Sequence, residues 1–248
     1  MFAALLVTLR EGFEAALIVA VVLAYLRQIG ALEQARSVWF GVGAAVAVSA
    51  AAGAALFLTG AELEGTTEAL FEGIVMLAAA GVLTWMVVWM QRQANTQGAH
   101  LRGQVDAALT VGGAALFGLA FLAVVREGLE TALFLFAAAG EAQPLPTVIG
   151  ALAGLALAVA LGWLVYRGGR RLPLRTFFTI TNLVLVAFGV YLVWKGVGEL
   201  GEAIGGEVFE ILGPLAAVIY GAAALVLLRR SRRGMDGLDG VRVEDAAA

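Results

Sequence analysis

Residues 4–26 read ALLVTLREGFEAALIVAVVLAYL, and residues 111–138 read VGGAALFGLAFLAVVREGLETALFLFAA. A helix that crosses a membrane needs about 20 mostly apolar residues, and both stretches are long enough. Each is interrupted by one arginine and two glutamates in the same order, REGFE at 10–14 and REGLE at 126–130. The chain therefore carries one charged motif twice, each time inside an apolar run.

The composition places the chain in a membrane. Of its 248 residues 61% are hydrophobic and 14% are charged, and the mean hydropathy is +0.92. Soluble domains contain about 45–50% apolar and about 25% charged residues. The absence of cysteine excludes disulfides and thiolate metal sites, and the single histidine, His100, excludes multi-histidine metal centres. We predict an integral membrane protein, in which a metal site would use oxygen ligands.

Seven apolar stretches have the length of a spanning helix: about 4–26, 38–59, 70–91, 111–138, 147–166, 177–197 and 211–229. They are continuously apolar and rich in Ala, Leu and Gly, which favours helices over the alternating segments of a membrane barrel. The sequence predicts an all-α integral membrane fold, with a seven-helix domain over residues 1–230. Residues 231–248 are predicted to form a disordered cytoplasmic tail.

The charged residues outside the motifs predict the orientation. Thirteen of the sixteen basic residues lie in the first, third and fifth loops and in the tail. Basic residues accumulate on the cytoplasmic side, so we predict that the N-terminus lies outside and the C-terminus in the cytoplasm. Glutamates occupy the loops on the other side, which makes the outer face acidic. The protein is predicted to be a multi-pass protein of the cytoplasmic (inner) membrane.

The two motifs place six charged side chains inside the membrane. Each costs about 2.5–3.5 kcal/mol at mid-membrane, so six unpaired charges would cost roughly 15–20 kcal/mol. Residues three and four apart share a helix face, so the two glutamates of a motif project together and its arginine can reach the second glutamate. The charges are therefore predicted to face other helices rather than lipid. The glycine in each motif allows a neighbouring helix or an ion to approach closely.

The motifs begin 116 residues apart, at Arg10 and Arg126, and each opens a block of three spans. Three is odd, so the second block is inverted relative to the first, an architecture of many transporters. We predict repeat 1 over about 1–92, repeat 2 over about 110–197 and a seventh helix over about 211–229. Antiparallel packing of the first and fourth spans would bring four carboxylates together.

Four glutamates against two arginines leave two negative charges, which a bound cation or protons must balance. Carboxylate ligands favour hard ions; ferric iron fits well, and magnesium, manganese and calcium also satisfy hardness. One alternative is a receptor or structural subunit that uses the Arg–Glu sets only to fix helix packing. The chain has no motif of an intramembrane enzyme, such as H-E-x-x-H, and we predict that it is not an enzyme.

The doubled motif resembles that of the oxidase-dependent high-affinity iron permeases of fungi and bacteria. Their hallmark is Arg-Glu-x-x-Glu in the first and fourth of seven helices, and the resemblance extends to about residue 230. It implies import of ferric iron, with iron as the transported substrate rather than a permanent cofactor. It also implies a separate extracytoplasmic oxidase or iron-binding partner. The metal ligands that it implies are Glu11, Glu14, Glu127 and Glu130, with Arg10 and Arg126 as countercharges.

Four outer glutamates are candidates for a relay that passes the ion to this site. Glu68 and Glu72 lie at the start of the third span and resemble the acidic entry of that helix in bacterial members. Glu199 and Glu202 lie in the sixth loop, where fungal members carry an acidic motif of different sequence. Simple solvation also accounts for these residues. The remaining alternative within transport is a permease for another hard or divalent metal, such as manganese or lead.

Overall fold

The structure of the chain is a computed structural model. It describes residues 1–93, 97–139, 144–167, 174–205, 209 and 211–227. The predicted tail, 231–248, lies outside the described residues.

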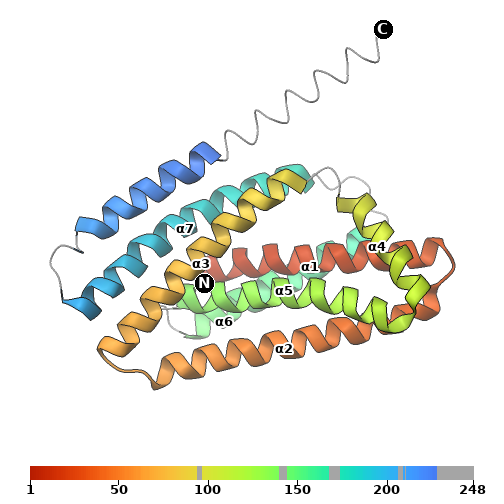
Figure 1. Cartoon of the computed structure of the whole chain (residues 1–248), viewed down its shortest axis with the longest axis horizontal. Coiled ribbons are helices and arrows are strands. Elements are labelled where there is room, and N and C mark those ends of the chain that lie inside the picture. The colour runs from red at the N-terminus through yellow and green to blue at the C-terminus, as the bar shows by residue number, and fades with distance from the viewer. Residues whose placement is uncertain (94–96, 140–143, 168–173, 206–208, 210, 228–248) are drawn as a thin grey trace, which may run out of the picture. The chain divides into compact units, whose positions relative to one another are not determined.

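The described elements are helices (Figure 1). They are α1 (Phe2–Gln28), the short 3-10 helix η1 (Leu32–Gln34), α2 (Ala35–Glu62), α3 (Thr66–Gln93), α4 (Gln97–Val111), α5 (Gly113–Ala139), α6 (Pro144–Tyr166) and α7 (Leu174–Ile204). A further apolar helix, here called the C-terminal helix, covers Ile211–Leu227. The predicted all-α fold class is thus confirmed for the residues that the structure describes.

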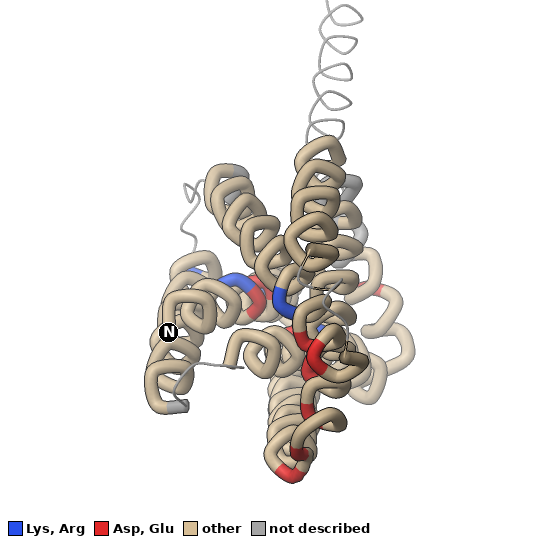
Figure 2. The backbone as a smooth tube through the Cα atoms, turned by 90° about the vertical axis from the view of Figure 1, so that its left-hand side faces the viewer, with Lys and Arg blue, Asp and Glu red and all other residues tan. Residues whose placement is uncertain are grey.

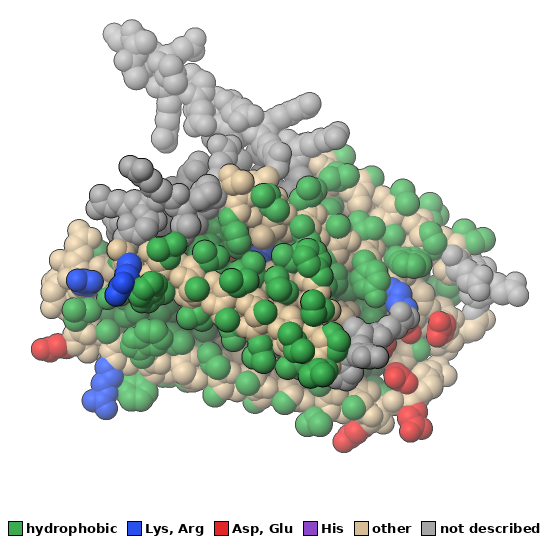
Figure 3. Space-filling model, turned by 180° about the vertical axis from the view of Figure 1, so that it is seen from behind, with side chains coloured by type: hydrophobic (Ala, Val, Ile, Leu, Met, Phe, Trp, Pro, Cys, Tyr) green, Lys and Arg blue, Asp and Glu red, His purple; other side chains and the backbone are tan. Residues whose placement is uncertain are grey.

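Within the described ranges, four helices are long and apolar enough to cross a membrane by length and composition: Leu32–Glu62, Thr66–Trp89, Leu145–Tyr166 and Thr176–Ile204. The helices α1 and α5 contain 27 residues each, but their central motifs add three charges to an otherwise apolar sequence. Large hydrophobic side chains such as Leu122 and Leu152 are exposed. Figure 3 shows hydrophobic side chains over much of the surface that it presents. This distribution suits a lipid-facing surface.

The helix α4 is an element that the sequence did not predict. Its residues fall in the predicted third loop, and the structure places Val105 and Ala108 in a buried apolar cluster with Leu26 and Leu116. Among the side chains of this helix that the structure describes, 103–111, only Val105 and Ala108 are buried, and two positions are too few to give a clear period.

The chain divides into two compact units. Unit 1 contains Met1–Glu68 and Asn95–Thr181, and unit 2 contains Ala69–Ala94 and Asn182–Ala248. Within unit 1, α1 packs along α6, α2 packs along α5, and α1 also contacts α5. Each motif-bearing helix therefore packs chiefly against a helix from the other half of the sequence.

Glycines give the two helix pairs of unit 1 matching contacts. A methyl group added at Gly41 of α2 would lie 2.5 Å from the Phe117 carbonyl oxygen of α5. A methyl group added at Gly150 of α6 would meet the carbonyl oxygen of Met1, the residue that precedes α1. Gly41 and Gly150 are 109 residues apart, and Met1 and Phe117 are 116 apart.

The same offsets recur 12 residues further along α2 and α6. An added methyl at Gly53 of α2 would lie 3.4 Å from Ala132 Cβ, and one at Gly162 of α6 would lie 2.6 Å from Ala16 Cβ. Small residues at such positions let helix backbones approach closely within a membrane. The α1–α6 and α2–α5 contacts therefore share one register along the helices.

This packing predicts opposite effects for two glycines of α2. Gly41→Ala is expected to lower stability by about 1–3 kcal/mol, because the methyl meets α5 backbone that cannot yield. Gly43→Ala is the matched control: a methyl there has no atom within 4 Å among the described residues, and alanine is the better helix former. Thermal unfolding of the two purified variants in detergent measures the difference, and equal midpoints would contradict the described packing.

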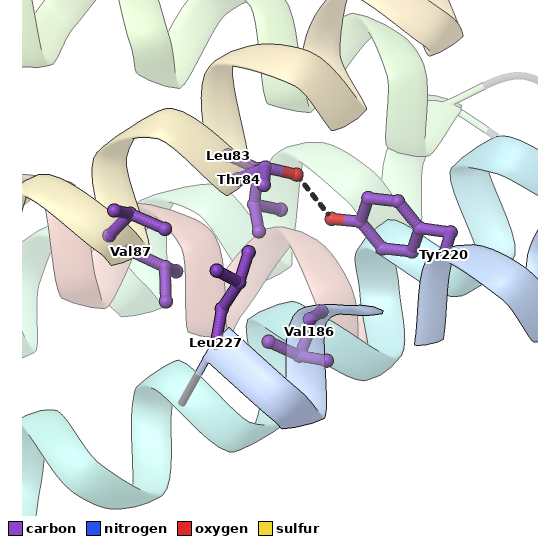
Figure 4. A pocket seen from close by; sticks show the side chains of 8 residues that line it. Leu83, Thr84, Val87, Val186, Tyr220 and Leu227 are labelled. Carbon is purple, nitrogen blue, oxygen red and sulfur yellow. Dashed lines mark hydrogen bonds between the residues drawn. The ribbon is translucent and has the colours of Figure 1, made fainter. Parts of the chain in front are cut away.

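Unit 2 contains a small, mainly apolar pocket between α3, α7 and the C-terminal helix (Figure 4). The Thr84 hydroxyl is hydrogen-bonded to the Tyr220 hydroxyl at 2.8 Å, as the dashed line shows. Gly189 of α7 leaves the room that the Tyr220 ring occupies. The lining offers a threonine and a tyrosine but no carboxylate or imidazole, so it is not suited to hold a hard metal ion.

Candidate metal centre

The two charged motifs meet where α1 and α5 pack together in unit 1. The C-terminal half of α1, with Val22 and Leu26, shares a buried apolar cluster with Leu116 and Ala120 from the N-terminal half of α5. The two helices therefore run antiparallel, as the sequence predicted. Figure 2 shows acidic and basic segments beside one another within helices that otherwise carry few charges.

The α1 motif is a buried ion-pair set. Arg10 and Glu11 are both 0% exposed, and the Arg10 guanidinium donates a hydrogen bond from Nη1 to Glu11 Oε1. Its Nη2 lies 2.9 Å from Glu14 Oε1. Helical spacing explains the second contact, because residues four apart stand one above the other on a helix face. The predicted reach of Arg10 to Glu14 is confirmed.

The α5 motif has the same sequence pattern but a more open arginine. Arg126 Nε donates to Glu130 Oε1 at 3.0 Å and lies 3.8 Å from Glu127 Oε1. The Arg126 side chain is 32% exposed, whereas Glu127 and Glu130 are both buried. The two halves of the site are therefore chemically alike but differently accessible.

Three of the four predicted ligands come together. Glu11 and Glu14 of α1 and Glu127 of α5 each offer a carboxylate oxygen, and these oxygens all lie within 4.8 Å of one another. We call these residues the carboxylate trio. Glu130 is not a member of the trio, and its Oε1 accepts a hydrogen bond from Arg126. Each oxygen of the trio is of the kind that hard cations prefer.

Several carboxylate oxygens in this region lack a hydrogen-bond partner. Among the described residues, none donates to the buried Oε2 atoms of Glu11, Glu127 and Glu130. Burial of a polar oxygen without a partner costs free energy, and burial of a charged one costs more. A cation placed among these oxygens would remove that cost.

The motif glycines bring further helices against the site, as the sequence predicted. A methyl group at Gly12 would lie 3.0 Å from Ala158 Cβ of α6, and one at Gly128 would lie 2.6 Å from Ser49 Cβ of α2. Ser49 is 9% exposed, and its hydroxyl has no hydrogen-bond partner among the described residues. The sequence did not single out Ser49, although it is the one hydroxyl between Ser37 and Thr59 of α2.

The trio contains none of the four outer glutamates. Glu68 is exposed in the first turn of α3, and Glu72 is partly buried one turn later. In α7, Glu199 Oε1 lies 3.6 Å from Lys195 Nζ, and Glu202 is exposed. Their part in ion transfer stays a prediction.

Comparison with known proteins gives the family. The iron permease FTR1 family matches residues 1–209. A protein of Archaeoglobus fulgidus that carries no functional name is 41% identical over 213 residues, 85% of this chain and 74% of its own.

Two bacterial relatives carry a functional name, ferrous iron permease EfeU. That of Yersinia pestis is 39% identical over 206 residues, 82% of this chain and 73% of the relative. That of Escherichia coli O6:K15:H31 is 39% identical over 206 residues, 82% of this chain and 75% of the relative. No solved structure matches the chain. The chain belongs to the iron permease FTR1 family, as a multi-pass protein of the cytoplasmic membrane.

Proposed function

We propose that the protein imports iron across the cytoplasmic membrane through a carboxylate site between α1 and α5. The observation that carries the proposal is the carboxylate trio, whose oxygens lie within 4.8 Å of one another among apolar helices. Glu130 completes a set of four ligands as the ion passes. The names of the EfeU relatives support iron as the substrate.

Charge balance supports a cation at this position. The four motif glutamates face only two motif arginines, which leaves two negative charges in a region of low dielectric. Iron would neutralise this excess and bind the Oε2 atoms that lack partners among the described residues. When no ion is bound, Arg10 and Arg126 stabilise the site by pairing with the carboxylates.

The ion bound at the site is proposed to be ferric. A purely carboxylate ligand set is hard, and Fe(III) is harder than Fe(II). The EfeU relatives are named for ferrous iron, so the oxidation state must be measured rather than carried over from the name. A separate extracytoplasmic oxidase or iron-binding protein would supply the ion, and Glu68, Glu72, Glu199 and Glu202 would pass it inward.

The transport architecture is proposed to be two inverted three-helix repeats followed by the C-terminal helix as the seventh span. The matched register of the α1–α6 and α2–α5 contacts supports it, since a two-fold relation exchanges these pairs. The N-terminus would lie outside and the C-terminus in the cytoplasm. Alternating access in repeat-based transporters involves movement around such a central site.

Uptake by proteoliposomes that contain the purified protein tests the proposal. Radioactive iron is offered as ferric citrate, or as ferrous iron with ascorbate, and unlabelled manganese or lead competes. We expect saturable iron uptake, faster from the ferric form, with weak competition from the other metals. Faster uptake from the ferrous form would overturn the assigned oxidation state. Stronger competition by manganese or lead would instead identify a different substrate.

Iron-dependent thermal stabilisation separates transport from a purely structural role of the motifs. A protein that binds iron in its folded state gains stability as the free iron concentration rises above the dissociation constant. We expect a higher unfolding midpoint in the presence of ferric citrate than in the presence of iron-free citrate. An unchanged midpoint together with no uptake would favour ion pairs that serve helix packing only.

A further inference from the structure

The two arginines of the repeated motif differ in their surroundings. The Arg10 side chain is 0% exposed, and that of Arg126 is 32% exposed. Both belong to the same Arg-Glu-x-x-Glu pattern, so the difference comes from the packing of neighbouring helices and not from the motif. An arginine that is enclosed on all sides cannot move without disturbing the core, whereas a partly exposed arginine can change its side-chain conformation.

The partners of the two arginines also differ. Arg10 pairs with Glu11 and Glu14, which both belong to the carboxylate trio. Arg126 forms its closer contact, at 3.0 Å, with Glu130, the motif glutamate outside the trio. It lies 3.8 Å from Glu127, which joins the trio from α5. The Arg126 guanidinium is thus hydrogen-bonded to Glu130, the motif carboxylate outside the trio, and lies next to Glu127 of the trio.

We propose that Arg126 is a tethered cation that competes with the transported ion for Glu130. This inference rests on the proposed function of the site. In the ion-free protein Arg126 holds Glu130; when iron enters the trio, repulsion between the two cations drives Arg126 from Glu130, which becomes a fourth ligand. Return of Arg126 to Glu130 then weakens the site and promotes release of the ion. Arg126 is a positioning residue, because it acts through Glu130 and does not bind the metal.

A competing arginine and a merely structural arginine predict opposite changes in iron affinity when Arg126 is replaced. Removing a competing positive charge tightens cation binding, whereas removing a structural partner weakens it. One charge-assisted hydrogen bond corresponds to about a tenfold change in an equilibrium constant. Arg126→Gln should therefore bind iron about tenfold more tightly than the wild type and transport it more slowly, because release is impaired.

The test measures ferric citrate binding by equilibrium dialysis with radioactive iron, and uptake in proteoliposomes, for the wild type and two variants. Arg126→Lys retains the charge but loses the planar two-point geometry. We expect the affinity for iron to rise from wild type to Arg126→Lys to Arg126→Gln, with slower uptake in the same order. The lysine variant tests the inference by itself if the glutamine variant does not fold. Equal or weaker binding by the folded variants would overturn it.

The double variant Arg126→Gln/Glu130→Gln shows whether the effect passes through Glu130. If it does, the gain in affinity disappears when Glu130 is replaced, and the two changes are non-additive. A gain that persists in the double variant would overturn the role of Glu130. Failure of the wild type to bind or take up iron would overturn the proposed function, whereas a functional wild type without tighter variants overturns this inference alone.

Discussion

Glu127→Gln is expected to abolish iron uptake while the protein remains in the membrane at its normal amount. Glutamine preserves the shape of the side chain but removes a charge and replaces one carboxylate oxygen by a donor group. Glu127 is the member of the trio that α5 contributes, so its loss leaves only the two glutamates of α1. Glu14→Ala should have the same effect, because it removes a second member of the trio. Uptake of radioactive iron, divided by the amount of protein in the membrane, measures both.

A loop glutamate provides the control for charge alone. Glu64 is exposed between α2 and α3 and is not a member of the trio. Glu64→Gln changes the net charge as Glu127→Gln does, and we expect it to retain most of the uptake. Normal uptake by both Glu127→Gln and Glu14→Ala would exclude the proposed ligand set.

Arg10→Gln is expected to destabilise the protein severely. The Arg10 guanidinium is 0% exposed and pairs with two carboxylates, Glu11 and Glu14. Removing one partner from a buried ion pair costs about 3–5 kcal/mol, because charges remain buried without compensation. Thermal unfolding in detergent and the amount of protein in the membrane are the measurements.

Arg27→Gln is the matched control, since Arg27 is an exposed residue near the end of the same helix. Its stability should stay near that of the wild type. Neutralising a carboxylate in the Arg10→Gln background, as in Arg10→Gln/Glu11→Gln, should restore part of the lost stability. A single Arg10→Gln variant as stable as Arg27→Gln would contradict the buried ion-pair set.

Much of the helical framework could be predicted from apolar run length. The spans predicted at 38–59 and 147–166 fall inside α2 and α6, because a continuously apolar run of this length has few alternatives to a membrane helix. The helix α4 was missed, since its burial depends on the ends of α1, α2 and α5 and leaves little periodicity in its own sequence. The close contacts at Gly41 and Gly150 likewise depend on which helices pack together.

The sequence by itself determined the membrane setting, the doubled motif and the surplus of carboxylates over arginines. It also determined that Arg10 can reach Glu14 and Arg126 can reach Glu130, because i,i+4 neighbours share a face of any helix. Only the tertiary structure decided that Glu127 joins Glu11 and Glu14 while Glu130 stays with Arg126. Distances between helices and the exposure of an arginine are set by residues remote in the chain, and the repeated motif contains no information about them.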